Sequence, residues 1–144
     1  MLHLRERILV VDDDPDCRAL LDAIFSMYGF EVLTTDTVLG ASTLIASFRP
    51  HVILLDLALP YRSGASWLAQ LKSNPNTVGI PVVILSAVPD LLPAERRRQA
   101  AAITQKPFRP RALVDTVRAV CARPVLVAAP LRLGSASSQP LGSL

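Results

Sequence analysis

The sequence predicts an α/β fold, a doubly wound parallel sheet of five strands with helices on both faces. Short apolar runs rich in β-branched residues alternate with segments whose apolar residues recur at helical spacing, and five such units fit within residues 7–121. Right-handed crossovers leave a layered parallel sheet as the compact arrangement of these units. With 144 residues, 51% of them hydrophobic, the chain can build the core of one domain of ordinary size.

Two strands and two helices are expected in the first half of the chain. Residues Arg7–Val11 form an apolar run that ends abruptly in aspartates, as a buried parallel strand does where it leaves the sheet. A helix follows over residues 15–28, because a proline suits its first position, a preceding aspartate can cap it and Gly29 offers a stop. Residues 30–35 alternate like a strand, and residues 38–48 return to the helical period.

The same alternation continues in the second half. Strands are expected at residues 51–55, 80–86 and 101–104, and helices at residues 64–73, about 91–100 and 110–121. The first two of these strands read as buried runs, one ending in the carboxylate of Asp56 and the other in the hydroxyl of Ser86.

Polar side chains stand where the predicted strands end: Asp12 and Asp13, then Asp56, Ser86 and finally Lys106. Because ligands of such sheets bind outside the carboxyl ends of the strands, these residues are expected to converge on one edge. Three carboxylates repel one another unless a hard cation lies among them, and Mg²⁺ fits that need. A lysine and a hydroxyl beside them suit a phosphoryl group, which one carboxylate can attack. The structural alternative is that strand-end acids merely avoid burial and cap helices.

Four separated motifs resemble those of one family. The segments ILVVDDDPDCR, HVILLDLALP, PVVILSA and KPF, in this order, are similar to the receiver domain of bacterial two-component response regulators, the CheY-like superfamily. The resemblance covers about residues 6–122 and assigns residues 1–122 to a receiver domain. It implies a flavodoxin-like five-stranded parallel sheet with the strand order 2-1-3-4-5.

The resemblance also implies roles for the strand-end residues. Asp56 would accept a phosphoryl group from a phosphohistidine on a partner kinase, with Mg²⁺ as cofactor. Asp13 and Asp56 would bind the ion directly, Asp12 would act mainly through water, and Ala58 would lend its backbone carbonyl. Ser86 would hydrogen-bond the phosphoryl oxygens.

The last strand both follows the family pattern and departs from it. Lys106 would pair with the phosphoryl oxygens, and Pro107 would follow it in a cis peptide bond. The family couples motion of the hydroxyl residue to an aromatic residue on the fifth strand, where this chain has Ile103. We therefore expect either that switching involves Ser86 and its loop alone, or that partners recognise the switch surface in a different way.

Two apolar residues stand where the family flanks the path of the hydrolytic water. They are Ala58 and Val88, two positions after Asp56 and Ser86 respectively. Neither side chain can orient a water molecule by hydrogen bonding. The sequence therefore predicts slow self-dephosphorylation.

Charge is distributed unevenly along the chain. Residues 1–90 carry 10 acidic and 6 basic residues, whereas residues 91–144 carry 2 acidic and 9 basic ones. The late basic residues include Arg96, Arg97, Arg98 and Arg111, which are expected near a face formed by the fourth and fifth helices. Such residues ordinarily form a solvated surface; the functional alternative is a docking face for an acidic partner or for a homodimer.

The expected partners are proteins, namely a sensor histidine kinase or phosphotransfer protein and a downstream effector. No DNA-reading helical motif follows residue 122, so direct nucleic-acid binding is not expected. The sequence shows no bilayer-spanning apolar run and no secretory signal, which predicts a cytoplasmic protein without membrane contact. Residues 123–144 contain prolines and a Gly/Ser-rich end and are expected to form a poorly ordered tail.

The predicted switch would be a signalling module that catalyses only its own phosphorylation and slow dephosphorylation. Two other functions remain possible. One is an unphosphorylated receiver-like scaffold, which Ile103 favours and the complete strand-end set opposes. The other is a haloacid-dehalogenase-type phosphatase. Its DxDx[T/V] signature needs Thr or Val where this chain has Asp16, and it leaves Asp56 without a role.

Overall fold

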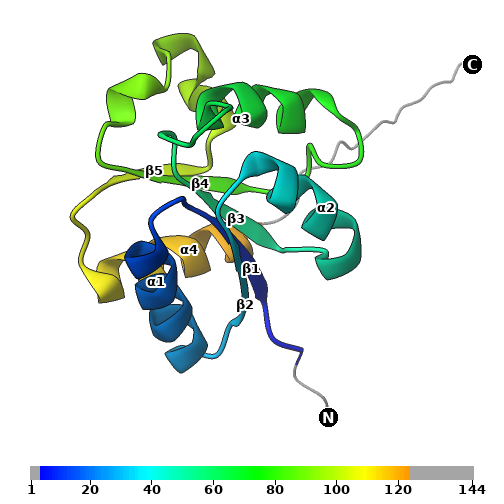
Figure 1. The fold of residues 1–144 in the computed structure, drawn as a ribbon. Coiled ribbons are helices and arrows are strands. Elements are labelled where there is room, and N and C mark those ends of the chain that lie inside the picture. The colour runs from blue at the N-terminus through cyan, green and yellow to red at the C-terminus, as the bar shows by residue number, and fades with distance from the viewer. Residues whose placement is uncertain (1–3, 124–144) are drawn as a thin grey trace, which may run out of the picture.

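The computed structural model describes residues 4–123, in which five strands form one parallel sheet (Figure 1). The strands are β1 (Arg7–Val11), β2 (Glu31–Thr35), β3 (Val52–Leu55), β4 (Val82–Ser86) and β5 (Ala102–Gln105). They lie in the order β2-β1-β3-β4-β5, which confirms the predicted fold class and strand order. The predicted tail lies, apart from residue 123, outside the described residues.

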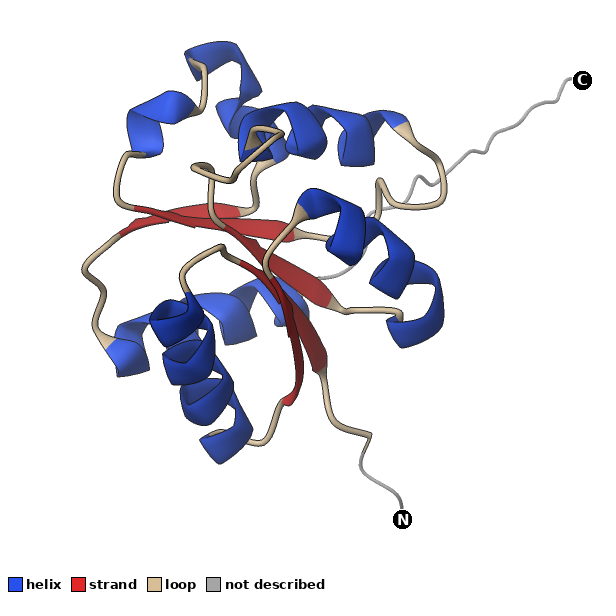
Figure 2. Ribbon diagram, viewed as in Figure 1, coloured by secondary structure: helices blue, strands red, loops and turns tan. Residues whose placement is uncertain are grey.

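Helices cover both faces of the sheet (Figure 1, Figure 2). Helices α1 (Pro15–Met27) and α4 (Pro110–Ala122) pack on one face, and α2 (Val38–Phe48) and α3 (Gly64–Ser73) pack on the other. The first three helices begin at a side chain that accepts a backbone hydrogen bond, as an N-cap does: Asp14, Thr37 and Ser63. None of the helices within residues 4–123 is long and apolar enough to cross a membrane.

The core consists of two apolar layers, one on each face of the sheet. Alternate residues of β1 enter different layers: Ile8 and Val10 pack on the side of α1 and α4, whereas Leu9 and Val11 pack on the side of α2 and α3. The apolar residues of β3 and β4 divide between the layers in the same way, and these central strands are buried along their whole length. Burial on both faces explains why these strands read as nearly continuous apolar runs.

The predicted helix at residues 91–100 is wrong. The chain instead forms two short 3₁₀ helices, η1 (Pro89–Leu91) and η2 (Ala94–Gln99). Pro93 stands between them with φ −58° and ψ 146°, and a proline has no N–H with which to continue a helical hydrogen-bond ladder. Neither short helix buries a side chain, and Leu92 between them is the residue that anchors the segment, with 1% of its surface exposed.

Four strands differ from the sequence pattern in their boundaries, the first being β2, which begins one residue later than predicted. β3 begins one residue later than predicted, and β4 begins at Val82 because Pro81 before it has no N–H to pair. β5 is shifted by one residue, so that its last residue, Gln105, pairs with Ser86 at the end of β4. This register places Lys106 directly beyond the edge of the sheet.

Candidate functional site

The carboxyl ends of four strands bring the predicted polar side chains together. β1 and β3 are paired up to their last residues, so Asp12 and Asp56 leave the sheet side by side. β4 and β5 also end together, and the backbone N–H of Lys106 donates to the carbonyl of Ser86 at 2.9 Å. Residues that lie up to 94 positions apart in the sequence therefore meet at one edge.

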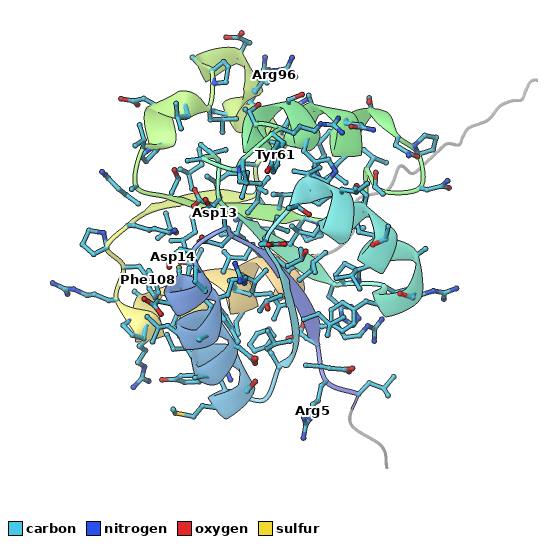
Figure 3. All side chains as sticks on the ribbon, viewed as in Figure 1. Arg5, Asp13, Asp14, Tyr61, Arg96 and Phe108 are labelled. Atoms are coloured by element: carbon cyan, nitrogen blue, oxygen red, sulfur yellow. The ribbon has the colours of Figure 1, made fainter. Side chains whose placement is uncertain are left out.

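Three carboxylates form the centre of this site. Asp12, Asp13 and Asp56 each offer an oxygen within 4.8 Å of the others. Asp12 and Asp56 expose only 2% and 7% of their surface, whereas Asp13 is exposed on the loop between β1 and α1 (Figure 3). Carboxylate oxygens in this arrangement are the donors that a hard divalent cation prefers.

Lys106 is the cation that contacts these carboxylates within the described residues. Its Nζ lies 2.7 Å from Asp12 Oδ2 and 3.1 Å from Asp56 Oδ2. Burial alone lowers the pKa of Lys106, but the hydrogen bond and charge of Asp12, together with those of Asp56, raise that pKa above its usual range. The ammonium is therefore charged at neutral pH. The bond from Lys106 to Pro107 is cis, as the resemblance implied.

Ser86 is the last residue of β4, Val88 follows it by two positions, and Ala58 follows the end of β3 by three. Ser86 is 1% exposed, and its Oγ accepts a hydrogen bond from the backbone N–H of Val88 at 3.1 Å. A hydroxyl that accepts in this way still has its own O–H to donate. The backbone N–H of Ala58 donates to Asp56 Oδ1 at 3.2 Å. The side chains of Ala58 and Val88 offer no hydrogen-bonding group.

Two residues of α1 that sequence reasoning missed also reach the site. Arg18 Nη1 donates to the backbone carbonyl of Asp12 at 2.8 Å. Burial, and then a hydrogen bond with Asp12, raise the pKa of the Cys17 thiol to about 11. Their place in the sequence could have identified them. Both residues lie in the first turn of the helix that follows Asp12 and Asp13, and the first turn of such a helix lies at the same edge of the sheet as the end of the strand.

The start of α3 fixes the backbone that follows Asp56. The N–H of Gly64 donates to the carbonyl of Leu57 at 3.0 Å, and a Cβ at position 64 would lie 2.5 Å from the carbonyl oxygen of Asp56. Only glycine allows so close an approach of two backbones. In the loop between them, Tyr61 has a positive φ of 67° and a fully exposed side chain (Figure 3).

The other predicted residues lie away from the carboxylates. Ile103 is half-buried in β5 and packs with the layer under α2 and α3. Arg96, Arg97 and Arg98 lie on η2, where Arg97 forms a surface ion pair with Asp90 at 3.3 Å. Arg111 lies on α4, and η2 and α4 flank β5 on opposite faces of the sheet (Figure 1). A docking role for these arginines stays a prediction.

Comparisons with known sequences identify similar proteins. A family model described as the response regulator receiver domain matches residues 8–118. The DNA-binding response regulator MtrA of Mycolicibacterium smegmatis is 35% identical over 118 residues, which cover 81% of this chain and 50% of MtrA. The phosphate regulon transcriptional regulatory protein PhoB of Pseudomonas aeruginosa is 32% identical over 141 residues, 93% of this chain and 60% of PhoB. The chain thus spans about half the length of MtrA.

Solved structures show the same fold. A sensor protein from Polaromonas sp. JS666 matches with a TM-score of 0.77 and 24% identity, covering 82% of this chain and 97% of that chain. The chemotaxis response regulator CheY4 of Vibrio cholerae matches with a TM-score of 0.71 and 22% identity, covering 81% of this chain and 99% of that chain. At these identities the two structures support the fold alone.

Proposed function

Because the chain belongs to the response regulator receiver domain family, we propose that it is a phosphoryl-accepting switch that acts in a two-component phosphorelay. Asp56 is the proposed acceptor, and the proposed donor is a phosphohistidine on a sensor kinase or phosphotransfer protein. One observation carries this proposal: the buried carboxylate of Asp56 lies 3.1 Å from the Lys106 ammonium and beside two further carboxylates. That set combines a nucleophile, a charge to neutralise phosphoryl oxygens and ligands for a cation.

The same residues fit Mg²⁺. Three carboxylates and one ammonium give the site a formal net charge of −2. This charge and the oxygen donors of the carboxylates suit a hard dication. Asp13 and Asp56 would hold the ion directly, with the carbonyl of Ala58. Asp12 would act mainly through water, as the resemblance to the family implies. When bound, the ion neutralises charge on the phosphoryl oxygens as a Lewis acid.

Phosphoryl transfer makes one bond and breaks one. A carboxylate oxygen of Asp56 attacks phosphorus while the phosphorus–nitrogen bond to the donor imidazole breaks. The imidazole leaves with that electron pair and takes up a proton from solvent. Lys106 is held in place to pair with the transferred oxygens, and the O–H of Ser86 is free to donate to one of them. The added charge then favours inward movement of Ser86 and its loop.

The proposed output is a protein contact. A downstream effector or a second copy of the chain would read the surface around η2, β5 and α4, where Arg96, Arg97, Arg98 and Arg111 lie. MtrA is named a DNA-binding protein, but this chain spans about half of its length, so the absence of direct nucleic-acid contact by residues 4–123 stays a prediction. A cytoplasmic location is proposed in line with the response regulator relatives.

Incubation with Mg²⁺ and acetyl phosphate, followed by intact mass measurement, tests the proposal. The wild-type chain is expected to gain the mass of one phosphoryl group, and Asp56→Ala is expected to gain none. Asp115→Ala is the matched control, because Asp115 is exposed on α4 outside the carboxylate site. This control should form the adduct as the wild type does.

Each alternative has its own outcome in this experiment. No adduct on the wild-type chain would support the unphosphorylated scaffold. Turnover of unrelated phosphomonoesters would support the phosphatase. An adduct that persists in Asp56→Ala would place the acceptor on another residue and overturn the assignment.

A further inference from the structure

A groove of about 660 Å³ lies between α2 and α3, at the opposite end of the sheet from the carboxylates. Its walls include Pro50 and Ile80, which precede the first residues of β3 and β4, whereas Asp56 follows the last residue of β3. α2 and α3 cover the same face of the sheet (Figure 1). The volume is in the range of pockets that hold small organic ligands.

The inner surface of the groove is apolar. Trp67 and Leu71 of α3 form part of it, with 2% and 4% of their surfaces exposed, together with the half-buried Ile45 and Ile80. Branched aliphatic side chains that are half-exposed at the surface suit contact with an apolar body. Because neighbouring residues cover almost all of Trp67 and Leu71, the half-buried Ile45 and Ile80 supply the open part of this apolar surface.

Hydrogen bonds hold the wall between α3 and β4 in place. Lys72 Nζ donates to the carbonyls of Val78 at 3.1 Å and Ile80 at 2.6 Å. The hydroxyl of Thr77 donates to the carbonyl of Leu71 at 2.7 Å. These three hydrogen bonds hold the wall against α3 in the absence of a ligand. A preformed site loses less conformational entropy on binding.

The rim of the groove carries positive charge. Arg49 is the charged residue of the lining; the Arg49 guanidinium has no hydrogen bond or ion pair within the described residues, and no acidic residue lines the groove. Arg62 lies outside the lining but donates a hydrogen bond to the side chain of Gln70 on the rim. Amides of Asn74 and Asn76 complete the polar part of the rim. These groups favour an anion held above the apolar surface.

From this arrangement we propose that the groove binds a small organic anion, a flat apolar body that carries one carboxylate or sulfonate. The apolar body would lie against Ile45 and Ile80, next to the buried indole of Trp67, and the anionic group would pair with Arg49. This site is separate from the proposed phosphorylation of Asp56 and does not depend on it.

Titration with 1-anilinonaphthalene-8-sulfonate, an apolar body with one sulfonate, tests the proposal on the full chain. Binding is expected to saturate at one probe per chain and to shift the indole N–H resonance of Trp67, the single tryptophan of the sequence. Arg49→Gln is expected to weaken binding about three- to five-fold, the value of one exposed charge pair. Ala46→Phe, which fills the groove from α2, is expected to abolish the shift.

Arg109→Gln is the matched control, because Arg109 is an exposed arginine at the start of α4, outside the groove. It should bind the probe as the wild type does, and circular dichroism should confirm that every variant is folded. The proposal is wrong if no saturable binding occurs up to millimolar probe. It is also wrong if Ala46→Phe keeps the indole shift, or if Arg49→Gln and Arg109→Gln bind equally well.

Discussion

At the scale of single residues, we expect the apolar side chains of Ala58 and Val88 to control how long a phosphoryl group would stay on Asp56, the proposed acceptor. Ala58 and the half-exposed Val88 leave an attacking water without a hydrogen-bonding partner. Replacing them, in Ala58→Asn or Val88→Glu, is expected to speed the decay of phospho-Asp56 about ten-fold, since a positioned polar group assists proton transfer. The measurement is the loss of the mass adduct with time after acetyl phosphate is removed.

The control for this prediction is Met27→Asn, which adds an amide at an exposed apolar residue at the C-terminal end of α1, at the opposite end of the sheet from the carboxylates. Its adduct should decay at the wild-type rate. Equal decay of the wild type, Ala58→Asn and Val88→Glu would contradict the prediction, because it would mean that the flanking side chains do not control the hydrolytic water.

A second residue-scale prediction concerns pH and Cys121. Burial, with the negative charge of Glu6 next in importance, raises the pKa of this thiol from 9.0 to about 12. Because the folded state favours the neutral thiol, this contribution to stability is present below pH 9 and is lost as the pH rises towards 12. At pH 9 the folded thiolate fraction falls about a hundred-fold or more below that of an unfolded chain, and alkylation should slow accordingly.

Iodoacetamide labelling at pH 9, followed by mass measurement, checks this prediction. The Cys17→Ser background leaves Cys121 as the one cysteine of the chain. Native protein is compared with protein unfolded in urea. Equal labelling rates in the two states would show that the fold does not protect the thiol.

The sequence predicted the site residues that lie at the ends of strands. It did not predict the residue that reaches the site because of how α1 is oriented on the sheet. Asp12, Asp56 and Ser86 end apolar runs, so periodicity alone locates them at one edge. The contact of Arg18 with the carbonyl of Asp12 depends on how α1 is turned against the sheet. The periodicity of the sequence does not determine this orientation of α1, because the packing of the helix against the rest of the core determines it.

At the scale of elements, the junction between β3 and α3 brings two backbone segments close together beside Asp56. A Cβ at Gly64 would meet the backbone of Asp56 and Leu57 at 2.5 Å and 2.8 Å. Since neither backbone atom can swing away as a side chain could, Gly64→Ala is expected to cost about 2 kcal/mol of unfolding free energy. It should also slow phosphorylation by acetyl phosphate, because the carboxylate of Asp56 would move.

Urea unfolding, followed by the fluorescence of Trp67, measures this cost. Gly79→Ala is the matched control: no atom lies within 4 Å of a Cβ there, and its φ is not in the left-handed region. The control should change stability little. A loss of stability in Gly79→Ala as large as in Gly64→Ala would mean that the effect is general to glycine replacement.

Elements were predictable where they bury an apolar face and unpredictable where they do not. The central strands place apolar residues in both layers and each of the four α helices places them in one layer, so the pattern of apolar residues in the sequence predicts these elements. The segment 89–99 buries no side chain in either 3₁₀ helix, so its sequence carries no such period. Pro93 interrupts the segment, which forms two 3₁₀ helices in place of the single predicted helix.

At the scale of the whole molecule, the two apolar layers force like charges together. Burial of β1 and β3 on both faces fixes their register, and that register sets Asp12 beside Asp56. In the unfolded chain these carboxylates are far apart and do not repel. The folded state therefore carries an electrostatic cost that Lys106 offsets only in part, because the site keeps a formal charge of −2. Any cation bound there should stabilise the entire fold.

Mg²⁺ is accordingly expected to raise the free energy of unfolding of the wild-type chain, by about 1.4 kcal/mol at ten times its Kd. Asp13→Asn should lose most of this gain, and without Mg²⁺ it should be slightly more stable than the wild type because one like charge is gone. Urea unfolding at constant ionic strength measures both effects, with Asp115→Asn as a control at an exposed acid outside the site. The same Mg²⁺ increment in Asp13→Asn and in Asp115→Asn would refute a cation site at the carboxylates. A gain in the wild type that EDTA reverses and that Asp13→Asn lacks would instead link Mg²⁺ at this edge to the stability of the whole sheet.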